Sequence, residues 1–312
     1  MAEINKTIQL KQTSNEDVIH YFPVTRWDSV ENKPSLSTNN ILHNWDFTNP
    51  VNSRGLTTYA NIYGYTIDRW ACFTTNNGSL QLNGVDGITL NFPDAYNQFL
   101  QFIENPHIYL GLTLTASVDI GGNIYSVTGT MPNQMPTSGN VDVANLNIPV
   151  TQSRLRVHID SANDGALRCG IMGTATNEVV GGVRRMKLEL GSVSTLATDP
   201  PMDFGRELAI CQRYQLDIRG RRVRAYLIYP DAIHFALSLP TTLRITPTLI
   251  GYPSVYTTNT INGLQSGFSF NISSPVNSAG QVVITASKTA HGLTDAMMIF
   301  DSVNLAMLDA NL

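Results

Sequence analysis

The sequence predicts an all-β protein, in which a jelly-roll β-sandwich is followed by a smaller C-terminal β-sandwich. Two observations predict this class. Apolar residues alternate with polar ones in steps of two, which is the period of a half-buried strand. Gly, Asn and Asp turns separate these segments at short intervals, as in sandwiches and jelly rolls. The best helix candidate is short, from Phe204 to Tyr214, and lies where the two β-domains meet.

Residues 1–38 are the first of three predicted parts. They are polar and contain two strand-like pieces, residues 7–10 and 18–22, with a turn between them. A segment of this size buries too little apolar surface to fold alone. We expect it to fold on a partner or on copies of itself, with Trp27 as an anchor in that contact. The alternative is that Trp27 packs on its own domain.

Residues 39–197 carry the predicted jelly roll. Residues 108–120 alternate without error, a Gly-Gly-Asn turn follows, and a second strand returns, which together predict a hairpin. Residues 154–160 alternate equally well, with His158 among the side chains expected to point outward. Two sheets of such strands cover each other's apolar faces, so this part is expected to fold independently.

The strand that closes the jelly roll leads into a joint, residues 184–214. Alternation places Lys187 and Glu189 on the solvent side of that strand. Two prolines after Asp199 then prevent regular hydrogen bonding to a neighbouring strand, and the short helix follows.

Residues 198–312 are the third part, in which the helix is followed by further strands. Ile233, Phe235 and Leu237 alternate with polar or small residues. The last eight residues include an apolar run, 305–308. We expect this run to pair into a sheet or to be buried between subunits, because free chain ends normally fray.

Composition narrows the class of protein. Charged residues make up 14% of the chain, against about 25% in typical soluble domains. This profile suits an extracellular or virion β-protein that neutral polar groups keep soluble. The net charge of −4 gives no electrostatic basis for binding nucleic acid or an anionic membrane. The three cysteines are far apart, which favours buried free thiols over a disulfide framework.

Neither a signal peptide nor a membrane-spanning helix is expected. Residues 1–12 lack an apolar core, and no apolar run approaches about 18 residues. We therefore expect a soluble protein made in a cytoplasm and exported, if at all, by a route such as lysis.

Catalytic motifs are missing from the sequence. It contains no Walker A loop, no GxGxxG after a strand, no HExxH and no GxSxG. The six histidines are scattered without metal-ligand spacing. We predict that the chain is not an enzyme and needs no cofactor. A carbohydrate-active enzyme is the less favoured alternative, since paired carboxylates need not be neighbours in sequence.

Candidate glycan-binding residues are Tyr63, Tyr65 and Arg69, in an aromatic-rich run. Sugars stack their C–H faces on exposed aromatic rings, while polar side chains fix the hydroxyls. The alternative is that most of this aromatic mass, including Trp70, belongs to the core. The basic cluster 219–224 has two interpretations: a contact with phosphate or an acidic glycan, or an exposed turn that a neighbouring subunit's acids balance.

Three blocks of the sequence resemble bacteriophage tail-fibre and receptor-binding fibre proteins, especially those of gut phages. The first block spans residues 10–34 and includes Tyr21-Phe22-Pro23-Val24-Thr25-Arg26-Trp27. The second, residues 44–70, opens with Asn44-Trp45-Asp46-Phe47 and ends with Ile67-Asp68-Arg69-Trp70. The third is the joint, from Lys187 to Tyr214, and residues 308–312 are similar to the ends of such fibres.

The resemblance implies a homotrimeric virion fibre subunit, assembled in the cytoplasm of a bacterial host, with a carbohydrate-binding-module-like jelly roll. Its N-terminal segment would dock on other virion proteins through Tyr21, Phe22 and Trp27. Its β-domains would attach to a host-surface glycan or protein by multivalent binding, without nucleic acid and without membrane insertion. The alternative is a head fibre, collar or tail adaptor with a purely structural role.

The resemblance also suggests a place for a metal ion. In some jelly-roll modules the first and last strands share a structural calcium ion, and Asp46 and Glu189 occupy roughly such positions. The alternative for both carboxylates is a strand-end salt bridge or hydrogen bond.

Overall fold

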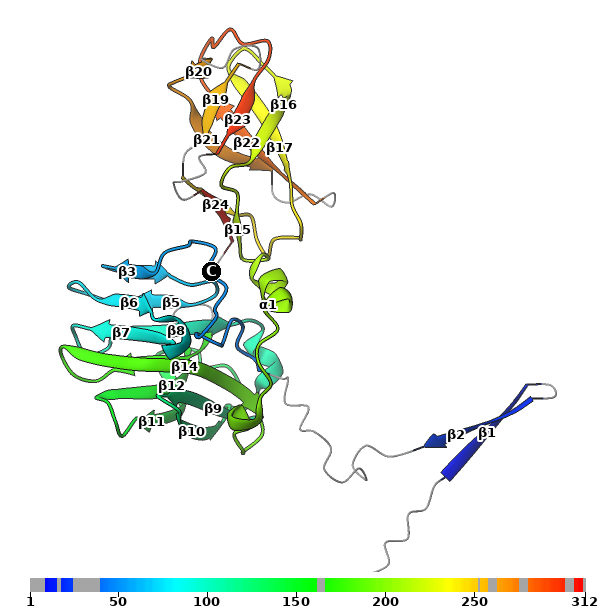
Figure 1. Ribbon diagram of the computed structural model, residues 1–312, viewed down its shortest axis with the longest axis vertical. Helices are drawn as coiled ribbons and strands as arrows, with labels where there is room; N and C mark the ends of the chain where they lie inside the picture. Colours follow the sequence, from blue (N-terminus) through cyan, green and yellow to red (C-terminus); the bar gives the residue numbers. More distant parts are fainter. Residues whose placement is uncertain are drawn as a thin grey trace, which may run out of the picture. The chain divides into compact units, whose positions relative to one another are not determined.

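The computed structural model describes residues 9–15, 18–24, 40–161, 166–251, 253–257, 263–274, 280–300 and 306–310. The chain forms two compact units, Met1–Asn39 and Asn40–Leu312. The prediction of an all-β fold is confirmed, because antiparallel sheets make up both units and the described residues contain a single α-helix (Figure 1).

The first unit contains a hairpin. Strand β1 (Gln9–Asn15) pairs antiparallel with β2 (Val18–Val24). Of the three docking candidates, Tyr21 and Phe22 lie on β2, and Trp27 lies outside the described residues.

The second unit begins with a sandwich of two six-stranded antiparallel sheets. In spatial order, the first sheet contains β10 (Asn123–Thr130), β9 (Thr113–Ile120), β14 (Glu178–Leu190), β7 (Ile88–Phe92), β6 (Ser79–Leu82) and β3 (Thr58–Ala60). The second contains β11 (Asn140–Asn147), β12 (Ser153–Asp160), β13 (Ala166–Gly173), β8 (Gln98–Ile103), β5 (Ala71–Phe73) and β4 (Tyr63–Tyr65). The short 3-10 helices are η2 (Gly84–Asp86), η3 (Pro106–Tyr109) and η4 (Leu196–Thr198). The chain crosses repeatedly between the sheets, as in a jelly roll.

Aromatic rings fill the centre of the sandwich. Trp70 stacks on Phe99 at 4.8 Å between centroids, and Phe47 meets both rings edge-on at 5.0 and 5.5 Å. All three side chains are fully buried. The indole N–H of Trp70 donates to the carbonyl of Asn44 at 2.9 Å, so its polar atom is also satisfied. Trp70 is therefore a core residue.

The predicted hairpin is confirmed as β9 and β10, joined by two residues, Gly121 and Gly122. Both glycines have positive φ, at 60° and 90°, as a type I′ turn requires. The first strand is shorter than predicted and begins at Thr113, because the chain before it turns through η3, which has a proline in its first turn.

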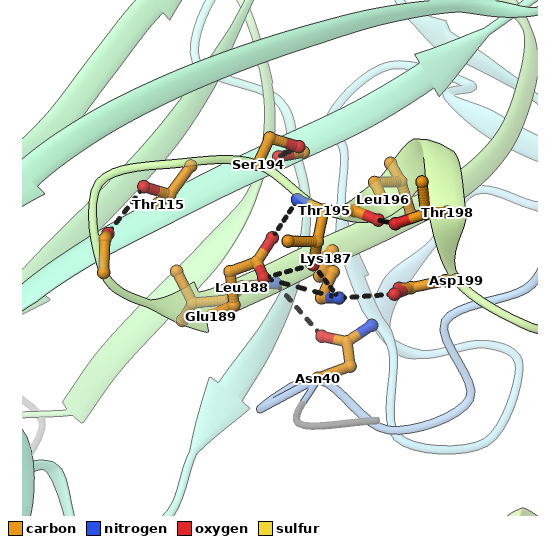
Figure 2. Close-up of polar contacts among 12 residues, drawn as sticks. Asn40, Thr115, Lys187, Leu188, Glu189, Ser194, Thr195, Leu196, Thr198 and Asp199 are labelled. Carbon is orange, nitrogen blue, oxygen red and sulfur yellow. Dashed lines mark hydrogen bonds and ion pairs between the residues drawn. The ribbon is translucent and has the colours of Figure 1, made fainter. Parts of the chain in front are cut away.

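A polar cluster covers the outer side of β14, where the sequence predicts solvent (Figure 2). The ammonium of Lys187 lies 2.6 Å from Asp199 Oδ1, 2.7 Å from Thr195 Oγ1 and 3.4 Å from Glu189 Oε2. Lys187 is completely buried. The solvent-facing prediction for Lys187 and Glu189 is wrong because residues 191–199 fold back over the strand. Alternation defines the two faces of a strand and does not say what covers them.

The segment before β3 runs along the free edge of β14. Ile41 N donates to Leu188 O at 2.8 Å, and Phe47 N donates to Arg184 O at 2.8 Å. The side chain of Asn40 donates to Met186 O at 2.9 Å and accepts from Leu188 N at 3.0 Å. These bonds pair the backbone N–H and C=O groups of β14 on the side where β7 does not extend.

The second lobe, residues 215–310, has its own apolar core. One of its sheets contains β15 (Gln215–Asp217), β24 (Met307–Asp309) and β18 (Thr248–Ile250). The other contains, in spatial order, β20 (Leu264–Gln265), β19 (Ser254–Tyr256), β23 (Met297–Ile299), β16 (Arg222–Ile228), β17 (Ala232–Ser238), β22 (Gln281–Ser287) and β21 (Ser269–Ser274). Residues from both halves of the larger sheet belong to that core. The pairing register between β16 and β17 shifts at one point within β16. The apolar run near the C-terminus pairs into a sheet as β24, as the sequence predicts.

Helix α1 (Phe204–Cys211) lies between the sandwich and the second lobe (Figure 1). It starts at the predicted residue because Asp203 caps it, accepting from Arg206 N at 3.1 Å. It ends three residues earlier than predicted. Its buried residues are Glu207 and Cys211, and Glu207 accepts from Asn44 N at 2.7 Å. All three cysteines are free and buried, as predicted, and burial raises their pKa values.

Buried hydrogen bonds join the second lobe to the sandwich. Asp68 accepts from Ser53 N at 2.8 Å, from Ser53 Oγ at 2.6 Å and from the side-chain amide of Gln215. Arg54 donates to Gln215 Oε1 at 2.9 Å and to Asp309 at 3.0 Å. Burial raises the pKa of Asp68 to about 6, although its hydrogen bonds and Arg54 oppose this shift. The junction therefore holds an acid that is costly to keep ionised.

Lys187→Met should lower the free energy of unfolding by about 3–5 kcal/mol, because it leaves buried carboxylates without their cation. Urea denaturation at pH 7 measures this change. Lys288→Met is the control, since Lys288 is partly exposed and donates to one carbonyl, that of Ser266. Equal effects of the two substitutions would contradict the account of the buried cluster.

Asp68→Asn should stabilise the protein at pH 7 by about 2–3 kcal/mol and flatten its pH profile. The folded-state pKa of about 6 exceeds the ordinary 3.8, so proton binding stabilises the fold fully below pH 3.8 and no longer above pH 6. An amide keeps the acceptor for Ser53 N and Gln215 and donates to Ser53 Oγ. Unfolding free energies between pH 4 and 8 test this, with the exposed Asp86→Asn as control. Parallel profiles for the wild type and the Asp68→Asn variant would refute it.

Candidate ligand-binding face

The outer face of the second sheet carries aromatic, basic and amide side chains in three rows that run across the strands. Strand register defines the rows, because paired residues point to the same side of a sheet. The first row is Asn147, Arg154, Met172, Gln98, Phe73 and Tyr63; the middle row is Asn145, Arg156, Gly170, Leu100, Ala71 and Tyr65; the third is Asp142, His158, Arg168 and Phe102. We call these residues the groove face.

The middle row is the low part of this face. A shallow hollow that is open to solvent lies over it, with room for about one water molecule (≈ 10 Å³), and is lined by Gln98, Leu100, Arg156, His158, Gly170, Ile171 and Met172. Gly170 belongs to the floor because a Cβ there would lie 2.1 Å from Phe99 O and 2.6 Å from the Leu100 Cα. Gly170 and Ala71 are the small members of that row, and they leave room at its centre between two rows of larger side chains.

Aromatic rings form one end of the groove face. Tyr63 is 82% exposed, and its ring meets Phe73 edge-on at 5.1 Å between centroids. Phe102 lies 6.3 Å from both Phe73 and Tyr65. A large aromatic ring so open to solvent, and held by a neighbour, is suited to stack on a ligand.

Arginines form the other end. Arg156 Nε lies 2.5 Å from Asp142 Oδ1, and Arg168 lies 2.6 Å from Asp160. The guanidinium of Arg168 also covers the Phe102 ring at 4.9 Å, so the basic and aromatic ends are in contact. These pairs hold the two guanidinium groups in place.

His158 lies within the basic end; its predicted outward orientation is confirmed by the strand register, but it is only 4% exposed, so the expectation of a solvated side chain is wrong. Its side chain is on the outer side of β12, but the arginines and aspartates around it cover it. Burial lowers its pKa to about 3, and the charges of Arg156 and Arg168 add to that effect. The imidazole is therefore neutral at pH 7, with one N–H donor and one nitrogen acceptor.

Two of the three glycan-binding candidates lie on this face. Tyr63 and Tyr65 are on strand β4. Arg69 does not join them, since its side chain is 1% exposed. Its guanidinium lies 3.5 Å from the Tyr214 ring centroid and donates to Phe102 O at 2.9 Å. Arg69 thus packs at the lobe junction and is not available on the groove face.

The two calcium candidates are not brought together. Asp46 Oδ1 accepts from Thr48 N and Oγ1 at 3.0 and 2.6 Å. Glu189 binds Thr195 and Lys187 in the cluster of Figure 2, four residues along β14 from Arg185, the bridge partner of Asp46. Among the described residues, no group of three or more His, Cys, Asp or Glu side chains could hold a metal ion.

The basic cluster divides between two roles. Arg219 binds Asp217 at 2.6 Å and donates to Ser53 O at 2.9 Å, so it supports the lobe junction. Arg222 and Arg224 are exposed on β16.

Sequence reasoning did not identify Gln98, Phe102, Arg156 or Arg168 as members of a site. The alternation of residues 154–160 does predict that Arg156 points outward. What the sequence did not reveal is that β13, the partner of β12, lies beside β8, because that neighbour relation spans more than 50 residues of chain.

Comparison with known proteins finds no similarity to report: no family model, curated protein or solved structure matches this chain. Across the described residues, no helix is both long and apolar enough to cross a membrane.

Gly170→Ala should lower the free energy of unfolding by about 1–3 kcal/mol, because the added methyl group meets the backbone of β8. Gly181→Ala is the matched control on β14, where a Cβ would make an ordinary contact at 3.7 Å with Thr89 Oγ1. Thermal unfolding compares the two. A Gly170→Ala variant as stable as the control would show that Gly170 is not needed for the floor.

Proposed function

We propose that this chain is a non-enzymatic fibre subunit of a bacteriophage virion that binds a host-surface glycan on the groove face. The observation that carries the proposal is the exposed ring of Tyr63 beside a hollow lined by Gln98, Arg156 and His158. Glycans present both flat C–H faces and many hydroxyls. A ring that stacks and side chains that donate and accept hydrogen bonds are therefore the groups such a ligand needs.

The rigidity of the groove face supports this proposal. Its side chains stand on paired strands, and Arg156 and Arg168 are already held by Asp142 and Asp160. A site built on strands loses little conformational entropy when a ligand binds. The hollow is also shallow and open, which suits a weak single site.

Multivalency compensates for weak single sites. A homotrimer that docks on the virion by its N-terminal segment would present three groove faces on each fibre. Several weak contacts to one cell surface then act together, because the second contact forms at a high effective concentration.

A structural role in the virion is the second candidate, and one surface favours it. On and beside strand β16, Tyr226, Leu227 and Tyr229 are 57%, 39% and 50% exposed. Neighbouring apolar side chains of this size often mark a protein contact. A head fibre, collar or tail adaptor would use such a contact to bind another virion protein.

Tyr63→Ala should weaken binding of the full chain to host polysaccharide about ten-fold or more, because the stacking ring is lost. Tyr63→Phe should retain most of the affinity. Tyr229→Ala, an exposed tyrosine of the other lobe, is the matched control and should bind as the wild type does. Binding is measured on arrayed polysaccharides from candidate hosts.

Two outcomes would count against this function. If no host polysaccharide binds the full chain, the glycan proposal fails. If Tyr63→Ala leaves binding intact while Tyr229→Ala prevents incorporation into particles, the structural candidate is favoured instead.

A further inference from the structure

We propose that the ligand is an acidic polysaccharide, with the carboxylate of one sugar over the hollow and a neutral sugar stacked on Tyr63. This inference rests on the proposed glycan-binding function and names the chemical class of the ligand. It follows from the charge, the unpartnered polar atoms and the two unlike ends of the groove face.

The charge of the basic end favours an anion. This end contains three arginines and two aspartates: Arg154, Arg156, Arg168, Asp142 and Asp160. Each aspartate already pairs with one arginine. Arg154 lies two residues from Arg156 on the same side of β12 and has no ion-pair partner among the described residues. One positive charge on this end is therefore uncompensated.

Polar atoms without partners lie at the same end. Within the described chain, the buried Nε atoms of Arg154 and Arg168 and the Nδ1 of His158 make no hydrogen bond. His158 is 96% buried, with 4% of its surface exposed, and it lines the hollow. Leaving the two guanidinium donors unmet is costly, and an ionised carboxylate offers only acceptors. Guanidinium groups bind carboxylates by two parallel hydrogen bonds, which a hydroxyl does not match.

The two ends of the groove face require an extended ligand. Three strand spacings, about 14 Å, separate β4 from β13. One sugar ring does not span the distance from Tyr63 to the hollow, whereas a short stretch of polysaccharide does. The aromatic end lacks a charged side chain among the row members on β4 and β5, so a neutral sugar fits there.

The test uses the full chain on an array of bacterial polysaccharides, each printed in its native form and after reduction of its carboxylates to alcohols. The polysaccharides that bind should carry carboxylates, and their reduction should lower affinity about ten- to a hundred-fold. Arg156→Gln should cause a similar loss on native polysaccharide and little further loss on reduced polysaccharide. Arg156→Lys, which keeps the charge, should restore part of the binding.

Two controls separate this effect from general charge and from misfolding. Arg222→Gln removes an exposed arginine of the second lobe and should leave binding unchanged. Tyr63→Ala should weaken native and reduced polysaccharides alike, because stacking does not depend on the carboxylate. Unfolding curves of each variant confirm that it is folded.

The other possible outcomes would contradict either the acidic ligand or the glycan-binding function. Equal binding to native and reduced polysaccharide overturns the acidic ligand and leaves the glycan-binding function standing. A loss with Arg222→Gln as large as that with Arg156→Gln also overturns it, because the attraction is then non-specific. If no polysaccharide binds, the proposed function itself fails.

Discussion

The buried ammonium of Lys187 is the constraint on which the arrangement of the second unit depends. A charge with no exposure must be paired where it lies, and Asp199 and Thr195 supply that pairing from the segment after β14. This segment therefore has to fold back over the sheet. Its return brings the chain to Asp203, which caps α1, and α1 in turn places Glu207 on the backbone of Asn44. The direction in which the chain leaves the sandwich thus follows from one cation.

The groove face shows how a flat sheet acquires a binding surface without long loops. Register brings Gly170, Leu100 and Ala71 onto one row, and the rows on either side stand higher because their side chains are larger. The floor is fixed by close backbone packing at Gly170, whereas the walls are larger side chains on the outer side of the sheet. Recognition and folding therefore place different demands on neighbouring residues of the same strands.

The sequence predicted the local parts of this structure better than the distant ones. Period-two alternation and the Gly121-Gly122 turn depend on neighbouring residues, so the β9–β10 hairpin and the all-β class were predictable. The burial of Lys187 and of His158 depends on segments that return from elsewhere in the chain. Arg69 illustrates the same limit, because it follows two tyrosines of the groove face in sequence yet packs on Tyr214 at the junction. The groove itself needs the order of six strands, which no local pattern contains.

The pairing of β15 with β24 has a consequence for how such a protein can change. The second lobe starts on β15 and returns on β24, so its entry and exit lie one strand spacing apart, about 4.8 Å. A different module with adjacent ends could be spliced at this point without reshaping the sandwich. Recombination between related genes could then exchange the whole second lobe while it leaves the groove face unchanged.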